Sequence, residues 1–142
     1  MRPYLAALTA TGFLAAGCQS TPAPTHAQEK QTEVAKADPD GVQRVRVVAG
    51  GYFFKPNHII VKVNRPVERT ASREGGMVPH DLVIRAEDAG INVEQDLATE
   101  PRKIAFTPRK VGKYVIYCSK KPPFGGASHR ERGMEGVLEV VP

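Results

Sequence analysis

Four side chains in this sequence have the chemistry of soft-metal ligands: His80, Cys118, His129 and Met134. Thiolate and thioether sulfur are soft donors, and imidazole suits copper well. Two histidines and one cysteine in a trigonal plane, with a long axial methionine bond, form a recognised electron-transfer copper site. Zinc more often takes four cysteine or histidine ligands, and calcium or magnesium requires oxygen donors. The set therefore predicts one copper ion that alternates between Cu(I) and Cu(II).

The number of cysteines bears on this interpretation. The chain has two, Cys18 and Cys118, and if the first is modified at the N-terminus the second has no partner for an internal disulfide. One alternative is a buried cysteine that acts as a small hydrophobic residue. Another is a cysteine nucleophile with a histidine base, but that scheme leaves Met134 without a role. We therefore expect no enzymatic activity.

Short β-strands must position these ligands. Apolar and polar residues alternate in six or seven segments separated by turn residues, among them residues 44–49, 58–63, 80–84, 103–106, 114–118 and 137–141. The region from Ala86 to Leu97 lacks clean alternation, and we expect a long connection with a turn of helix there. This pattern predicts one all-β, antiparallel sandwich of about 100 residues. His80 opens one strand, Cys118 ends another, and the other two ligands precede the last strand.

Three motifs carry a family resemblance. They are Phe53-Phe54-Lys55-Pro56, Met77-Val78-Pro79-His80-Asp81-Leu82, and Gly112-Lys113-Tyr114-Val115-Ile116-Tyr117-Cys118 followed by His129 and Met134. The segment from about Val42 to Val141 thereby resembles the cupredoxins, the plastocyanin and azurin type of copper protein. The resemblance implies a Greek-key β-sandwich of about seven or eight strands with the metal at one end. It also implies copper bound by imidazole nitrogens, the Cys118 thiolate and an axial Met134.

The sequence departs from the common cupredoxin pattern at two points. Ten residues separate Cys118 from His129, a longer gap that resembles copper nitrite reductases. Nitrite reduction itself requires a second copper site between domains, and the binuclear copper centre of oxidase subunit II requires a second cysteine in the metal loop. The sequence favours neither of these two functions. Asp81 follows the first histidine where small cupredoxins often have asparagine, so the hydrogen bonding around the thiolate is expected to differ. His58 and Met77 are interpreted as surface or loop residues.

The N-terminus has the features of an export signal. A charge at Arg2 precedes an apolar run that ends Leu14-Ala15-Ala16-Gly17-Cys18, which resembles a bacterial lipoprotein signal. We interpret residues 1–17 as the signal peptide, 18–41 as a lipidated, flexible tether and 42–142 as the cupredoxin-like domain. These features predict a lipid-anchored protein that faces the periplasm of a bacterial envelope. Gln19 resembles an outer-membrane sorting signal.

The leading hypothesis is a monomeric one-electron carrier, with the loop near His129 at the surface as the electron exit. A periplasmic copper carrier or buffer, and a metal-free adhesion sandwich, are the alternatives. The formal charge of +5 permits an acidic redox partner near the His129 end, but no basic tract indicates nucleic-acid binding. The residues expected to form the docking face are Lys120, Lys121, Arg130 and Arg132.

Overall fold

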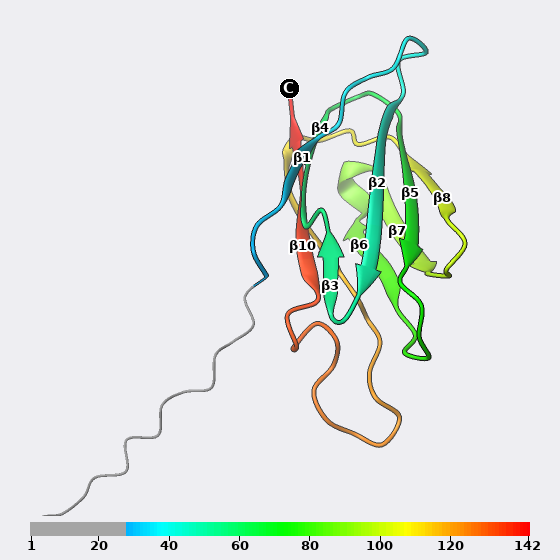
Figure 1. Cartoon of the computed structure of the whole chain (residues 1–142). Helices are drawn as coiled ribbons and strands as arrows, with labels where there is room; N and C mark the ends of the chain where they lie inside the picture. The colour runs from blue at the N-terminus through cyan, green and yellow to red at the C-terminus, as the bar shows by residue number, and fades with distance from the viewer. Residues whose placement is uncertain (1–27) are drawn as a thin grey trace, which may run out of the picture.

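Two β-sheets make up the part of the chain that the computed structural model describes, residues 28–142 (Figure 1). The six-stranded sheet has the order β1 (Thr32–Val34), β4 (His58–Lys62), β10 (Glu135–Val141), β9 (Gly112–Tyr117), β6 (Asp81–Ala86) and β7 (Ile91–Asp96). The four-stranded sheet has the order β3 (Phe53–Lys55), β2 (Gln43–Gly50), β5 (Val67–Arg73) and β8 (Arg102–Phe106). The predicted signal peptide and Cys18 lie outside the described residues.

The predicted β-sandwich is confirmed, but its sheets mix parallel and antiparallel pairs. Strand β2 lies parallel to β5, and β4 lies parallel to β10. This arises because the chain changes sheet at several points, such as from β3 to β4 and from β4 to β5, so that neighbours within a sheet are often distant in sequence. Alternation is clear in β2, where Val45, Val47 and Ala49 are buried and Arg44 and Arg46 are exposed. The apolar faces of the two sheets form one core.

The folded part begins earlier than the sequence predicted. Strand β1 pairs in parallel with β4, and Ala37 forms a bridge with Gln43. Both features lie within residues 18–41, where the sequence predicted a flexible tether. The side chains of Thr32–Val34 are exposed, so hydropathy gives no signal there. The strand forms because its backbone satisfies the N–H and C=O groups at the edge of β4.

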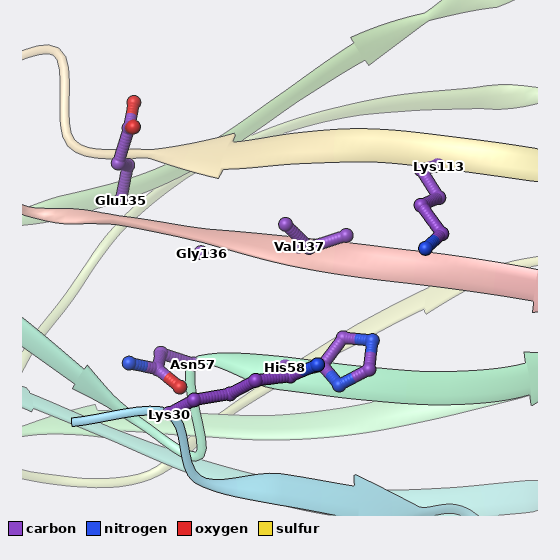
Figure 2. Close-up of a pocket in the computed structure, with 7 residues that line it drawn as sticks. All are labelled: Lys30, Asn57, His58, Lys113, Glu135, Gly136 and Val137. Atoms are coloured by element: carbon purple, nitrogen blue, oxygen red, sulfur yellow. The ribbon is translucent and has the colours of Figure 1, made fainter. Parts of the chain in front are cut away.

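His58 is buried rather than exposed, which corrects its interpretation as a surface residue. Its Nε2 donates to Glu139 at 2.8 Å, and its Nδ1 lies 2.9 Å from Thr32 Oγ1. The imidazole thus joins β1, β4 and β10. It lies beside a surface groove of about 340 Å³ lined by residues such as Lys30, Asn57 and Lys113 (Figure 2). His58 has a structural role in joining these three strands.

The expected irregular connection between Ala86 and Leu97 contains more structure than predicted. A turn of 3-10 helix, Glu87–Ala89, leads into β7, which pairs antiparallel with β6. Ile91 and Val93 are buried while Asn92 and Glu94 are exposed, so the alternation is short but present. Among residues 28–142, no helix has the length and apolarity to cross a membrane.

The core also contains a charged residue that the alternation did not predict. Arg69 on β5 is fully buried, and within residues 28–142 none of its three guanidinium nitrogens has a hydrogen-bond partner. Burial lowers its pKa to about 10. Its guanidinium carbon lies 5.7 Å from the centre of the Phe106 ring, a cation–π contact. This contact offsets part of the cost of desolvating the charge.

Candidate metal centre

The ends of two neighbouring strands place the first two predicted ligands. His80 immediately precedes β6 and Cys118 immediately follows β9, and these strands pair at Val83 and Tyr117. His129 lies in the connection between Cys118 and β10. This connection and the turns before β3 and β6 gather at one end of the sandwich (Figure 1). The metal centre therefore lies where strands from both sheets end.

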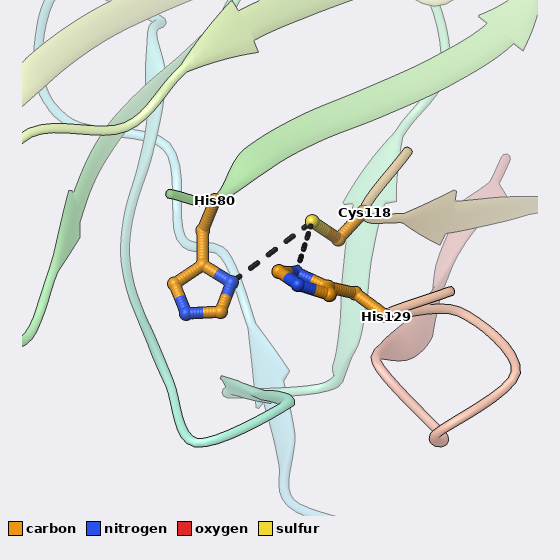
Figure 3. A group of neighbouring side chains, drawn as sticks. All are labelled: His80, Cys118 and His129. Carbon is orange, nitrogen blue, oxygen red and sulfur yellow. Dashed lines mark hydrogen bonds between the residues drawn. The ribbon is translucent and has the colours of Figure 1, made fainter. Parts of the chain in front are cut away.

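Three of the four predicted ligands come together in a buried cluster. One donor atom from each of His80, Cys118 and His129 lies within 4.8 Å of the other two, and all three residues are buried. Cys118 Sγ lies 3.4 Å from His129 Nδ1 and 4.0 Å from His80 Nδ1 (Figure 3). Metal–nitrogen and metal–thiolate bonds of about 2.0–2.3 Å, arranged trigonally, give donor separations of about 3.5–4 Å. The three side chains therefore fit one ion.

Met134 is placed beside this cluster by its backbone. Its N–H donates to the carbonyl of His129 at 2.9 Å, and its carbonyl accepts from the N–H of Cys118 at 3.2 Å. The side chain is fully buried. Its role as the axial thioether ligand remains a prediction.

Asp81 joins the two strand ends that carry His80 and Cys118. Its N–H donates to Cys118 Sγ at 3.5 Å. Its carboxylate accepts hydrogen bonds from the Ser119 N–H at 2.6 Å and from the Ser119 hydroxyl. Lys120 Nζ lies 3.6 Å from the same carboxylate and 2.6 Å from Asp96. Asp81 therefore links the two ligand-bearing strand ends, and Lys120 is paired with its carboxylate.

Burial also sets the protonation of the metal-free cluster. It raises the pKa of the Cys118 thiol to about 11, although hydrogen bonds from the Asp81 and Lys120 N–H groups oppose this shift. Burial lowers the pKa of both histidines, and the charge of Arg132 lowers that of His129 further. At neutral pH the imidazoles are therefore neutral and available as ligands, whereas the thiol must lose a proton before it binds a cation.

The sequence predicted that the loop near His129 lies at the surface, and Phe124 in that loop is fully exposed. The two imidazoles themselves are buried, with His129 3% exposed and His80 5% exposed. Tyr52 packs against both imidazole rings. Sequence reasoning missed Tyr52 and the Ser119 contact to Asp81. The pair Gly50-Gly51 indicates a turn before Tyr52, but it gives no sign that the turn reaches the metal ligands.

Comparison with known proteins identifies the fold. No protein-family model and no curated protein matches the sequence. Among solved structures, the chain is similar to the metal-binding domain of the Cu(I)-exporting P-type ATPase of Streptococcus pneumoniae, with Cu(I) (TM-score 0.61, 20% identity, 81% of this chain and 100% of that one). It is also similar to an apo copper-binding protein (TM-score 0.57, 20% identity, 83% and 100%).

A third similar structure is reduced auracyanin from Roseiflexus castenholzii (TM-score 0.56, 18% identity, 70% of this chain and 97% of that one). At these identities the similarity shows the fold alone. The protein therefore has a cupredoxin-like β-sandwich, as the sequence predicted. Its cluster of two histidines and one cysteine is compatible with a single copper site.

Proposed function

We propose that this protein binds one copper ion through His80, Cys118 and His129, with Met134 as the axial ligand, and carries single electrons. The observation that carries this proposal is the buried triangle of one sulfur and two imidazole nitrogens. A soft sulfur donor combined with two imidazoles suits copper better than zinc, calcium or magnesium. The similar structures include an auracyanin described as a "blue" copper protein, from Chloroflexus aurantiacus (TM-score 0.55).

The chain's own residues suit this role. Copper held by these residues would supply one redox-active ion. The Asp81 N–H stabilises negative charge on the Cys118 sulfur, and the Asp81 carboxylate holds the backbone after it. The β-sheet fixes His80 and Cys118 before any ion binds, so little rearrangement accompanies a change of charge. The burial of the three ligands keeps water from the site.

A copper carrier or buffer is the second candidate. The long connection between Cys118 and His129 favours it, because the tip of this loop is exposed and Phe124 is fully exposed. Such a loop opens more easily than a strand end, which would allow the ion to leave. The similarity to a metal-binding domain of a Cu(I) exporter is consistent with this candidate.

The proposed setting follows from the sequence. We place the protein in a bacterial envelope, anchored through lipid on Cys18 and facing the periplasm, as a monomer. An acidic redox partner would approach the His129 end. Lys120 is paired with Asp81 and Asp96, and Arg130 with Glu135, so Lys121 and Arg132 are the better candidates for steering such a partner.

The copper site is tested by adding Cu(II) to the full chain and recording the visible spectrum. We expect an intense thiolate-to-copper band that is absent in Cys118→Ser and altered in Met134→Leu. His58→Gln, which changes a buried histidine outside the cluster, should keep the band. Absence of the band in the unchanged protein would refute the proposed site. Fast electron self-exchange with tightly held copper would favour the electron carrier, and reversible loss to a competitor the copper carrier.

A further inference from the structure

The two histidine ligands are buried at an end of the molecule where surrounding loops could have left them open. His129 is 3% exposed and His80 is 5% exposed. The Cys118–His129 loop does not account for this by bulk apolar packing, because its large apolar residue, Phe124, is fully exposed. A side chain outside this loop packs on both imidazoles. The aromatic contacts identify it as Tyr52, in the turn between β2 and β3.

Tyr52 contacts both histidines at once. The centre of its ring lies 5.0 Å from that of His129 and 6.4 Å from that of His80, at interplanar angles of 78° and 85°. These are edge-to-face arrangements, which are favourable between aromatic rings. The two imidazoles lie 4.9 Å apart. The Nδ1 atoms of both imidazoles lie within 4.0 Å of the Cys118 sulfur, so the same two rings that present donors to the metal site also pack against Tyr52.

The backbone of Tyr52 is held in a conformation that a tyrosine rarely adopts. Its φ is +66°, in the left-handed region, and Gly51 before it has φ +40°. The side chain of Gln28 stabilises this turn, because it donates to the Tyr52 carbonyl at 3.1 Å and accepts from the Phe54 N–H at 3.2 Å. The same amide donates to the carbonyl of Gly133, next to Met134. A strained residue that neighbouring groups keep in place often has a functional role.

Arg132 packs on Tyr52 as well. Its guanidinium carbon lies 5.0 Å from the centre of the ring, and its Nε donates to the carbonyl of Ala127 at 3.2 Å. The cation–π contact joins the segment after His129 to the turn before β3. Tyr52 is therefore held by Gln28 through its backbone and by Arg132 through its ring.

We propose that Tyr52 is the cover of the metal site, which limits the exchange of copper with solution and excludes small external ligands. This inference rests on the proposed copper binding and adds the residue that decides how tightly the ion is kept. Tyr52 is a positioning and shielding residue rather than a ligand. Its movement away from His80 and His129 would open the site and favour copper exchange over copper retention.

The test uses the full chain loaded with copper and the variant Tyr52→Asn. Asparagine tolerates the left-handed backbone but lacks the ring, so the turn is preserved while the cover is removed. Tyr52→Phe keeps the ring. Tyr117→Thr is the matched control, because Tyr117 also carries an arginine over its ring, Arg130 at 4.7 Å, and it precedes Cys118. The rate of Cu(I) transfer to excess bathocuproine disulfonate is measured for each protein.

We expect Tyr52→Asn to release copper about tenfold faster, which is the change expected from losing two aromatic contacts. Tyr52→Phe and Tyr117→Thr should stay within about twofold of the unchanged protein, since neither removes the ring that contacts the histidines. Azide should change the visible spectrum of the Cu(II) form of Tyr52→Asn and leave that of Tyr52→Phe unaltered. If Tyr52→Asn does not fold, Arg132→Gln should release copper about twofold to threefold faster, because one cation–π contact is lost.

An unchanged release rate in Tyr52→Asn, or in Arg132→Gln where that variant replaces it, would overturn the inference. An equal acceleration in Tyr117→Thr would do the same, because the effect would then belong to the whole end of the sandwich. These results differ from a failure of the proposed function. If the proposed function fails, the unchanged protein shows no thiolate-to-copper band. If only the inference about Tyr52 fails, the unchanged protein shows the band and its copper release does not depend on Tyr52.

Discussion

The two sides of the metal centre are built in different ways. On the strand side, His80 and Cys118 lie at the ends of β6 and β9, which pair within one sheet, and Asp81 joins them. On the loop side, His129 follows the ten-residue segment Ser119–Ser128. That side is held by local hydrogen bonds, such as those from Ser128 to Glu131 and from the Arg132 N–H to the Ser128 carbonyl, and by the contact of Arg132 with Tyr52. The strand side is therefore fixed by paired strands, and the loop side by a short turn and a side-chain contact with another turn.

This difference has a consequence for how the site responds to change. Contacts made by a sheet open only when much of the domain unfolds, whereas local turns open at lower cost. We therefore expect that changes on the strand side affect the stability of the whole domain. Changes on the loop side should affect the retention of the ion more than the fold.

The largest effect is expected for Asp81→Ala on the strand side. Asp81 is 1% exposed, and its carboxylate accepts hydrogen bonds from the N–H and the hydroxyl of Ser119. Its loss leaves these groups without their acceptor, so the free energy of unfolding of the metal-free protein should fall by about 2–3 kcal/mol. Urea unfolding measures this value. Asp81→Asn can still accept from Ser119 and should lose about half as much; a loss below about 1 kcal/mol in Asp81→Ala would contradict the comparison.

The next effect is the dependence of metal-free stability on pH, which involves ligands of both sides. His80 and His129 have lowered pKa values in the folded state, so the unfolded state binds protons first as pH falls. The free energy of unfolding should therefore fall as pH drops below 6.5, the ordinary pKa of histidine, until the folded imidazoles also protonate. The pKa of Cys118 shifts the other way, from 9.0 to about 11, so the stability that this thiol contributes is lost as pH rises through that range.

Thermal unfolding measured across pH should thus show the greatest stability between the pH range in which the histidines titrate and the range in which Cys118 titrates. Cys118→Ser provides the control, because it should remove the alkaline decline and leave the acid decline in place. His129→Gln should reduce the acid decline without abolishing it, since His80 remains. Identical profiles for all three proteins would show that these buried groups do not control the pH dependence.

The smallest effect is expected for Ser128→Ala on the loop side. The Ser128 hydroxyl donates to Glu131 at 2.7 Å and accepts from the Glu131 N–H at 3.2 Å, next to His129. Its removal should lower the free energy of unfolding by about 1 kcal/mol and speed copper release severalfold. Phe124→Ser, in the same loop but fully exposed, should change stability by less than about 0.5 kcal/mol. If Phe124→Ser weakened copper retention as much as Ser128→Ala, the whole loop rather than its end would hold His129.

Much of the fold was predictable because alternation depends on local sequence. The alternation of Val45, Val47 and Ala49 with mostly polar residues predicts β2 directly, since every other side chain of a strand points into the core. Strand β1 was not predictable, because its exposed residues contribute backbone hydrogen bonds alone. The burial of Arg69 also escaped prediction, because an arginine at an inward position is normally excluded from a core by the cost of desolvation.

The candidate site was predictable to a similar degree. The residue types and chain order of His80, Cys118 and His129 predicted that the three side chains lie together, because a thiolate and two imidazoles suit a copper ion. The contact between Asp81 and Ser119 could be expected only in outline, from the family pattern around the first histidine. The cover by Tyr52 could not, because it depends on the angle of a turn and on the path of Gln28.

The sequence by itself determined the chemistry of this protein: the donor atoms, the strands that carry two of them, and the alternation that makes those strands fold into a sandwich. Donor type and strand periodicity are local properties, so they can be read without coordinates. Tertiary structure decided how deeply His129 is buried, which groups Asp81 joins and what Tyr52 covers. These depend on segments distant in the chain that meet only when the two sheets pack, and no local pattern encodes their relative position.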